Sequence, residues 1–181
     1  MEVFETGIEG LLLIKPRVFP DDRGYFFESF NQEKFPKDLR YQWVQDNESK
    51  STKGVLRGLH YQVGKHAQAK LVRAVIGSIY DVVVDIRKGS ETYGKWYGVE
   101  LTEENKLQLL IPRGFAHGFL VLSEEAIFSY KCDNFYNKES EGGILYNDPN
   151  LKIEWPISER EVQLSGKDKN QPLFGDHKPF E

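Results

Sequence analysis

Short runs of β-forming residues, separated by turn signals, occupy the middle of the chain. The runs cover residues 71–76, 79–86, 97–101, 107–111 and 126–132, and Gly77-Ser78 and Lys88-Gly89-Ser90 are two of the separators. Turn signals at intervals of about eight to twelve residues are typical of β-sandwiches and β-barrels. Between residues 79 and 86 the even-numbered side chains form an apolar face, with Asp81 and Asp85 on the other. The spacing therefore predicts an all-β fold.

The flanking regions predict a few more elements around this centre. Residues 10–14 and 25–30 have the composition of strands, with the turn signal Asp21-Asp22-Arg23-Gly24 between them. Residues 31–39 predict a short helical turn limited by Pro36, whereas residues 49–54 and 135–143 predict loops. Ser158 followed by Glu161 is the signature of a capped short helix. With no internal repeat or linker, we expect one domain of residues 1–181, with short helical segments mainly near its C-terminus.

Composition excludes several classes of function. The 181-residue chain has a formal net charge of −4 and scattered basic residues, which argues against nucleic acid as a partner. Its one cysteine, Cys132, cannot form an intramolecular disulfide and fits a reducing compartment. No apolar run approaches the roughly 20 residues that span a bilayer, and the acidic start of the chain lacks the features of a signal peptide. We therefore expect a cytoplasmic protein without a membrane partner.

One motif has the spacing of a metal site but lacks part of it. The pattern Pro112-x-Gly114-x-x-His117 resembles the second motif of the cupin superfamily, whose members are double-stranded β-helix jelly rolls. Their first motif has two histidines separated by one residue, whereas here His60 is followed at that spacing by Gln62. Two histidines do not make a metal site with three or four ligands. We expect a cupin-like barrel without a metal, the alternative being a divalent ion whose ligand set is completed by carboxylates.

A cluster of residues around position 60 has the chemistry of metal-free acid–base catalysis. Arg57, His60 and Lys70 fall within fourteen residues. Histidine transfers protons near neutral pH, and the two cations can stabilise a diphosphate or an enolate oxygen. Tyr130 can deliver a proton to the opposite face of a bound molecule. The alternative is a solvated strand end with a packed histidine.

A catalytic histidine also needs a partner that orients its ring. A carboxylate is the usual choice, and Asp168, Asp81 and Asp85 are the candidates for His60. The chain contains no P-loop and no dinucleotide-binding fingerprint, so we expect no cofactor.

The order of the motifs resembles the dTDP-4-dehydrorhamnose 3,5-epimerase family over essentially the whole chain. The motifs are Asp22-Arg23-Gly24, Phe27-Glu28, Gln45-Asp46-Asn47, Arg57-Gly58-Leu59-His60, Gln68-Ala69-Lys70, residues 81–87, residues 114–119, Tyr130-Lys131-Cys132, Tyr136, Trp155-Pro156 and Leu164-Ser165-x-Lys167-Asp168. Several ordered motifs at compatible spacing are far more specific than any one of them. The resemblance implies a cupin-like jelly roll that forms a homodimer, in which the N-terminal strands pair with the partner subunit.

The resemblance also implies a reaction and a set of roles. The expected substrate is thymidine diphosphate joined to a 4-keto-6-deoxyhexose, which is inverted at carbons 3 and 5. By this resemblance His60 removes the protons, and Asp168 supports it. Tyr130 returns a proton from the opposite side, Lys70 holds the enolate oxygen, and Tyr136 stacks on thymine. Further substrate contacts are implied for Arg23, Glu28, Gln45, Asn47, Arg57, His117, Glu141 and Lys167.

Alternatives stay open for single residues and for the activity. They are core packing for Tyr130 and Tyr136, a hydrogen-bonded relic of the cupin site for His117, and solvated surface charge for Glu141 and Lys167. Relatives in antibiotic-sugar pathways invert only one carbon with nearly the same residues. The alternative of another class is a non-catalytic cupin that binds a nucleotide sugar. Such a binder has no reason to keep His60, Lys70 and Tyr130 together.

Overall fold

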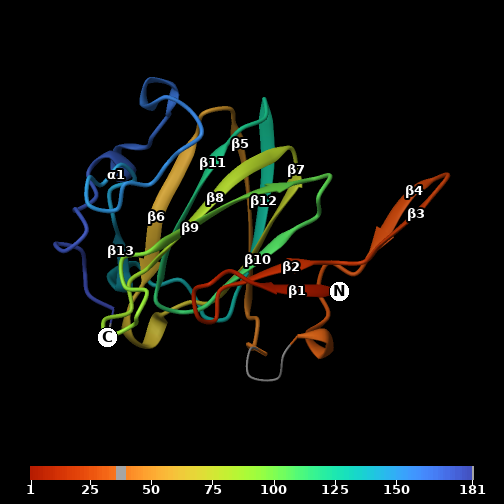
Figure 1. Cartoon of the computed structure of the whole chain (residues 1–181), viewed down its shortest axis with the longest axis horizontal. Coiled ribbons are helices and arrows are strands. Elements are labelled where there is room, and N and C mark those ends of the chain that lie inside the picture. The colour runs from red at the N-terminus through yellow and green to blue at the C-terminus, as the bar shows by residue number, and fades with distance from the viewer. Residues whose placement is uncertain (36–39, 181) are drawn as a thin grey trace.

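Two antiparallel β-sheets form the body of the molecule in this computed structural model (Figure 1). The structure describes residues 1–35 and 40–180. One sheet has the order β1 (Glu2–Glu5), β2 (Leu12–Lys15), β10 (Gln108–Ile111), β7 (Lys70–Ile76), β12 (Glu125–Cys132) and β5 (Gln45–Thr52). The other has the order β13 (Glu141–Gly143), β6 (Leu56–Gln62), β11 (Phe115–Val121), β8 (Ser78–Asp85) and β9 (Trp96–Thr102). The arrangement confirms the expected all-β, cupin-like jelly roll.

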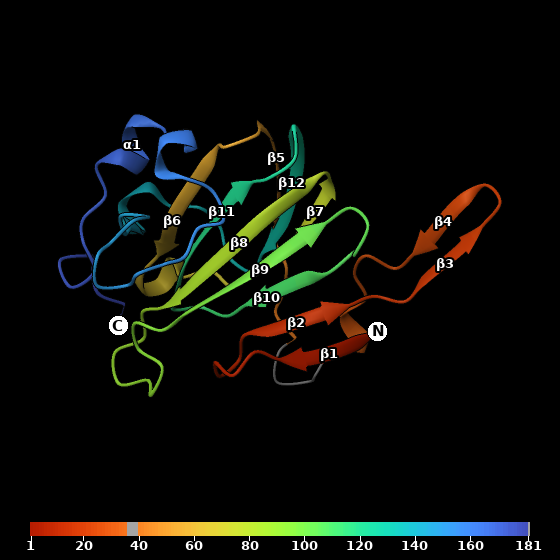
Figure 2. The ribbon, with the colours of Figure 1, turned by 45° about the horizontal axis from the view of Figure 1, so that its top comes forward.

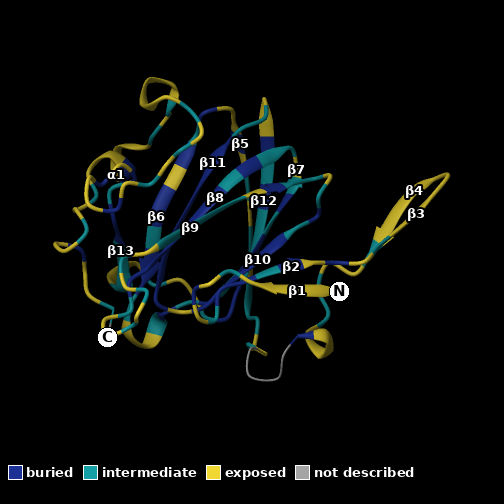
Figure 3. Cartoon of the chain, viewed as in Figure 1, coloured by how far each residue is buried: buried dark blue, intermediate teal, exposed yellow. Residues whose placement is uncertain are grey.

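A separate hairpin projects from one end of the body. Its strands are β3 (Val18–Asp21) and β4 (Gly24–Phe27), which pair only with each other among the described residues. Figure 2 shows the hairpin extending away from both sheets, and Figure 3 shows that it is largely exposed. Phe19, Tyr25 and Phe26 are each about half exposed or more. The hairpin is thus an aromatic arm without a core of its own within the described chain.

The helices are short, as expected. They are η1 (Gln32–Lys34), η3 (Gly64–His66), η4 (Lys138–Ser140), η5 (Glu159–Glu161) and α1 (Gly166–Lys169). The predicted capping box of Ser158 and Glu161 is present at η5. The helical turn expected at 31–39 is present as η1, and its remainder at 36–39 lies outside the described residues. None of the helices in the described part of the chain is long and apolar enough to cross a bilayer.

The main core lies between the sheets, and a second one lies outside them. Val72 of β7, Val83 of β8 and Phe128 of β12 are at most 1% exposed and belong to the inner core. Val82 and Val84 point the other way, into an outer core that the C-terminal segment covers with Trp155 and Phe174. Because β8 is buried on both faces, apolar side chains occupy both of them, and Val82, Val83 and Val84 follow one another in the strand. Burial of each such side chain stabilises the fold by about 1.5–3 kcal/mol.

The strands expected at 71–76, 79–86, 97–101, 107–111 and 126–132 are confirmed to within one residue at each end. Three other expectations were wrong. Residues 49–52 are not a loop but the second half of β5. This is an edge strand with polar side chains throughout, so it lacks the apolar alternation that predicts a strand. Glu141–Gly143 are not a loop but pair with β6, although glycine disfavours strands. The strand expected at 25–30 ends at Phe27, so Glu28 lies beyond it.

A buried carboxylate ties together the connection between β8 and β9. Asp85 is 0% exposed, and its two oxygens accept hydrogen bonds of 2.6–3.0 Å from Arg87, Ser90 and Thr92. Burial alone would raise the pKa of the Asp85 carboxyl, but hydrogen bonds from Arg87, Thr92 and Ser90 lower it to about 2. The ionised carboxylate therefore stabilises the folded chain.

The pH dependence of stability tests this arrangement. An aspartate pKa lowered from about 3.9 in the unfolded chain to about 2 contributes about 2–3 kcal/mol, which is lost as the pH falls from about 5 towards 1. Asp85→Asn should lower the free energy of urea unfolding at neutral pH and should lose less stability on acidification than the wild type. The control is Asp21→Asn, because the Asp21–Arg23 pair on the arm is exposed. Equal acid sensitivity of wild type and Asp85→Asn would contradict the interpretation.

Candidate active site

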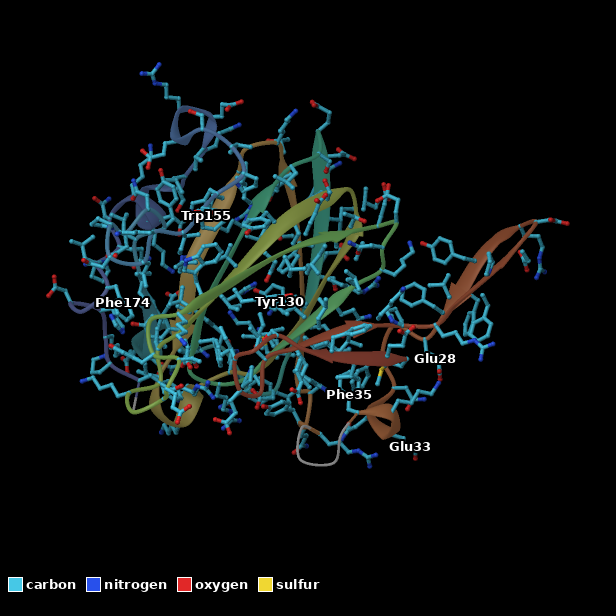
Figure 4. The ribbon with its side chains drawn as sticks, in the orientation of Figure 1. Glu28, Glu33, Phe35, Tyr130, Trp155 and Phe174 are labelled. Carbon is cyan, nitrogen blue, oxygen red and sulfur yellow. The ribbon has the colours of Figure 1, made fainter. Side chains whose placement is uncertain are left out.

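An open cavity lies between the sheets and is bordered by α1. Two adjoining parts of it, about 330 and 320 Å³ in volume, share the side chains of His60, Lys70 and Tyr130. Such volumes lie in the range of small-molecule sites. Figure 4 shows Tyr130 in the middle of the strands. One part is also lined by Ser49, Arg57, His117, Phe119, Phe128, Ser165, Lys167 and Asp168, and the other by Gln45, Asn47, Tyr61, Gln62, Gln68, Tyr136 and Glu141.

A β-bulge in β6 brings two of the cavity residues to the same face. His117 of β11 pairs with His60, whereas Phe119 pairs with Arg57, so three residue steps on β6 match two on β11. A regular strand would place residues three apart on opposite faces. Gly58 permits the bulge, since its φ is +133° and a Cβ there would lie 2.5 Å from the Gly118 Cα. The motif Arg57-Gly58-Leu59-His60 therefore describes a distorted strand.

His60 is oriented by a buried carboxylate. Its Nε2 lies 2.6 Å from Oδ1 of Asp168, which is 4% exposed. The Ser165 hydroxyl donates to Asp168 Oδ2 at 2.7 Å and accepts from the Asp168 backbone N–H at 3.1 Å, so Ser165 also caps α1. Burial raises the pKa of Asp168, but hydrogen bonds from His60 and Ser165 outweigh it and leave the pKa lowered. A carboxylate only accepts, so Nε2 carries the ring proton and Nδ1 is left to accept one.

Lys70 and Tyr130 both line the cavity, and burial shifts their pKa values in opposite directions. Burial lowers the pKa of the Lys70 ammonium, and electrostatic interactions with Cys132, Asp81 and Glu141 oppose this shift. The Lys70 Nζ lies 5.9 Å from the centroid of the Tyr130 ring. Burial raises the pKa of Tyr130, so its hydroxyl keeps its proton at neutral pH. The cavity thus offers a cation, a proton donor and the free nitrogen of His60.

Asp81, one of the candidates for orienting His60, serves another histidine. Its Oδ2 lies 2.9 Å from Nε2 of His117, and both residues are almost fully buried. Burial lowers the pKa of His117, and Asp81 opposes the shift. Asp85, the other candidate, ends β8 and accepts hydrogen bonds from the β8–β9 connection. Of the three carboxylates considered from the sequence, only Asp168 contacts His60. His117 is hydrogen-bonded in the core and also lines the cavity.

The rim of the cavity carries a linked set of polar side chains. The Tyr136 hydroxyl donates to Glu141 Oε2 at 3.2 Å, and Lys167 forms an ion pair with Glu141. The Gln45 amide donates to Asn47 Oδ1 at 3.0 Å and accepts from the Tyr136 backbone N–H at 3.2 Å. Tyr136 itself is 55% exposed. Glu141 and Lys167 are therefore partners at the cavity edge rather than isolated surface charges.

Arg23 and Glu28, two of the expected substrate contacts, do not line this cavity. Arg23 lies at the tip of the arm, pairs with Asp21, and has a side chain that is 89% exposed. Glu28 forms an ion pair with Lys34 and lies near the base of the arm, away from Tyr130 (Figure 4). Within one chain, the other eleven expected site residues come together and these two do not.

Several lining residues were not singled out from the sequence as site residues. They are Ser49, Tyr61, Gln62, Gln68, Phe119, Phe128 and Ser165. Gln68 and Ser165 stand inside motifs that also contain Lys70 and Asp168, and Phe128 shares a strand face with Tyr130. Ser49 carries no such signal, because the sequence predicts a loop for residues 49–54.

The cavity has no ready metal-ligand set. No group of three or more His, Cys, Asp or Glu side chains suited to a metal ion occurs in the part of the chain that the structure describes. The Gln62 side chain is hydrogen-bonded to backbone groups, and Asp81 and Asp168 are each paired with one histidine. These residues fit proton transfer and anion stabilisation.

Comparison with known proteins identifies the family. The model of the dTDP-4-dehydrorhamnose 3,5-epimerase family matches residues 5–176. The chain is 56% identical over 178 residues to the dTDP-4-dehydrorhamnose 3,5-epimerase of Shigella flexneri, with 97% of each chain covered. The crystal structure of dTDP-4-dehydrorhamnose 3,5-epimerase from Elizabethkingia anophelis is 57% identical, with a TM-score of 0.91 and 97% of each chain covered.

A second crystal structure contains a bound sugar nucleotide. It is a dTDP-6-deoxy-D-glucose-3,5-epimerase from Legionella pneumophila in complex with dTDP-4-keto-L-rhamnose. It is 49% identical to this chain, with a TM-score of 0.91 and coverage of 97% of this chain and 93% of that one. By sequence and structure, this chain belongs to the dTDP-4-dehydrorhamnose 3,5-epimerase family.

Proposed function

We propose that this chain is an enzyme of dTDP-rhamnose biosynthesis, which epimerises dTDP-4-dehydro-6-deoxy-D-glucose at carbons 3 and 5 to dTDP-4-dehydro-L-rhamnose. The observation that carries the proposal is the shared cavity of His60, Lys70 and Tyr130. Membership of the epimerase family supports it. No cofactor enters the scheme, since the steps below need only a base, an acid and a cation.

The reaction begins with proton removal beside the 4-keto group. His60, held by Asp168, takes the proton from carbon with its free Nδ1, and the electron pair moves onto the carbon-4 oxygen. Lys70 stabilises the resulting enolate oxygen, which lowers the barrier because the cation is already in place. Tyr130 then gives its proton to the carbon from the opposite face, and the configuration inverts. His60 then releases its proton to water and Tyr130 takes one up, and the same cycle at the second carbon completes the reaction.

The nucleotide part of the substrate occupies the outer half of the cavity. Arg57 supplies positive charge for the diphosphate, and Lys167, which also pairs with Glu141, contacts the substrate from the cavity edge. A charge-assisted hydrogen bond to the diphosphate contributes about 1.5–3 kcal/mol. Tyr136 stacks on thymine with its exposed ring. Gln45, Asn47, His117 and Glu141 make the remaining polar contacts. Residues 1–181 act as one epimerase domain, and we place it in the cytoplasm, where its single cysteine stays reduced.

Arg23 and Glu28 act on the substrate of a partner subunit. The family resemblance implies both a homodimer and substrate contacts by these two residues. Within one chain they lie outside the cavity, and the exposed aromatic arm that carries Arg23 has surface to bury. Both implications are met if the arm of one subunit reaches the cavity of the other in a two-fold dimer.

Deuterium exchange tests the roles of His60 and Tyr130. With dTDP-4-keto-6-deoxyglucose in deuterated water, His60→Asn should abolish exchange at both carbons, because no enolate forms. Tyr130→Phe should retain exchange, since His60 can return solvent deuterium to the same face, but inversion should slow by about 10²–10⁴-fold. Proton NMR measures both the deuterium uptake at each carbon and the configuration of the product. Exchange at neither carbon in the wild type would refute the epimerase, and exchange at one carbon only would identify a one-carbon epimerase.

Chelation tests whether a metal takes part. Because Gln62 replaces the second histidine of the cupin motif and Lys70 can hold the enolate oxygen, the epimerisation rate should survive exhaustive treatment with a chelator. The rate before and after treatment is the measurement. Loss of activity that one specific divalent ion restores would establish the carboxylate-completed metal site instead.

Mixed dimers test whether Arg23 acts across the subunit boundary. Arg23→Ala and His60→Asn dimers should each be impaired at substrate concentrations well below KM. In dimers formed randomly from equal amounts of both, about a quarter of the sites combine an intact His60 with an intact partner Arg23. Activity should therefore recover on co-expression. No recovery, with mixed dimers verified by mass, would mean that Arg23 does not act on a partner's substrate.

A further inference from the structure

Gln62 is a buried polar residue that has no role in the proposed reaction. It ends β6, two residues after His60, and is 5% exposed. A buried amide is costly unless its donors and acceptor are satisfied. In the sequence it stands where a cupin metal ligand is missing, and the structure shows what it does there.

All hydrogen bonds of the Gln62 side chain go to backbone groups of two loops. Its Nε2 donates to the His66 carbonyl at 2.8 Å and to the Phe135 carbonyl at 3.3 Å. Its Oε1 accepts from the Asn137 backbone N–H at 2.6 Å. Phe135 and Asn137 are the two neighbours of Tyr136. One side-chain amide therefore forms hydrogen bonds with the main chain on both sides of the exposed tyrosine.

Other side chains complete the hold on this loop. Gln45 accepts from the Tyr136 backbone N–H at 3.2 Å, and Asn134 accepts from the Phe135 N–H at 2.9 Å. Gln68 donates to the Asn134 carbonyl at 2.7 Å. The backbone groups around Tyr136 are thus satisfied by side-chain amides rather than by a neighbouring strand. Gln62 is the one of these amides that bonds both flanking residues.

We propose that Gln62 is a positioning residue that fixes the loop around Tyr136 and so presents the ring, already ordered, to the base of the nucleotide. The inference rests on the stacking role given to Tyr136 in the proposed function. A loop that is fixed before binding does not have to be ordered by the ligand, which raises affinity without any direct contact. Since Gln62 does not touch the reacting carbons in this scheme, its effect should fall on binding rather than on chemistry.

Three variants and one control test the proposal. Gln62→Met keeps the length and volume of the side chain but removes all three hydrogen bonds. It should weaken dTDP binding about tenfold by calorimetry and raise KM similarly, because base–aromatic stacking is worth about 1–3 kcal/mol. kcat should stay within about threefold, a split that general damage to the site would not give. The matched control is Gln163→Met, which removes a glutamine bond to the Lys53 carbonyl on the exposed surface and should change neither constant.

A double-mutant cycle shows whether Gln62 acts through Tyr136. Tyr136→Ala alone should weaken dTDP binding about tenfold, and adding Gln62→Met should cost less than about twofold more. Additive losses would overturn the proposal, and so would wild-type affinity of Gln62→Met beside a weakened Tyr136→Ala. If Tyr136→Ala binds dTDP as tightly as the wild type, the stacking role is wrong and this inference is wrong with it. The exchange experiment on His60 still tests the proposed reaction independently.

A measurement on the wild type alone guards against a variant that does not fold. The Asn137 amide hydrogen should exchange slowly before any nucleotide is added, because Gln62 already holds it. Slow exchange supports the proposal. Fast exchange that becomes slow only with dTDP would overturn it, since the loop would then be ordered by the ligand.

Discussion

The close approach of two glycines, Gly58 on β6 and Gly118 on β11, is the constraint on which the cavity depends. A Cβ at Gly118 would lie 2.7 Å from the Arg57 carbonyl oxygen, so a side chain at either glycine would push the strands apart. The bulge that they permit turns Arg57 and His60 into the cavity and sends Leu59 to the outer core, where it is 0% exposed. One local distortion thus supplies a cation, a cavity-lining histidine and a packing residue from four consecutive positions.

The charges of the cavity are arranged so that positive charge is left for a substrate. Asp168 is paired with His60, and Glu141 is paired with Lys167. Among the described residues, Arg57 forms no ion pair but donates to the Ser51 hydroxyl, and Lys70 forms none either. In a chain of net charge −4, these cations make a local field of the opposite sign, which attracts a diphosphate. Burial of Lys70 without an ion-pair partner is costly, and an enolate oxygen would offset part of that cost.

The sequence predicts this fold well where burial produces a pattern and poorly where it does not. β7, β8, β10 and β12 pack on the inner core, so their apolar alternation marks them almost to the residue. β5 lies at a sheet edge with a polar outer face, and β13 consists of a glutamate and two glycines, so neither has such a signal. Their pairing is set by β12 and β6, which are distant in the chain.

Single residues of the site could be predicted only where they stand in a recognisable motif or in a strand with apolar alternation. His60, Lys70, Tyr130 and Asp168 were expected together and line one cavity. From the residues alone the choice among Asp168, Asp81 and Asp85 could not be made, because it depends on which loop returns to β6, and only the family resemblance implied Asp168. The distance of Arg23 from the cavity was equally hidden, since a projecting hairpin has the same local sequence as one folded onto the body.

The position two residues after His60 carries an amide where the cupin motif has a histidine. A histidine there would add a second ligand beside His60, whereas Gln62 instead bonds backbone groups on both sides of Tyr136. In the proposed scheme, positive charge for the enolate comes from a side chain, and Lys70 lies in the same cavity with a pKa lowered by burial. A lysine with a lowered pKa gains more from a nearby oxyanion than one in water, because the oxyanion restores the stability of its charged form. In the proposed scheme Lys70 thus serves the enolate oxygen, and Gln62 serves the loop that carries Tyr136.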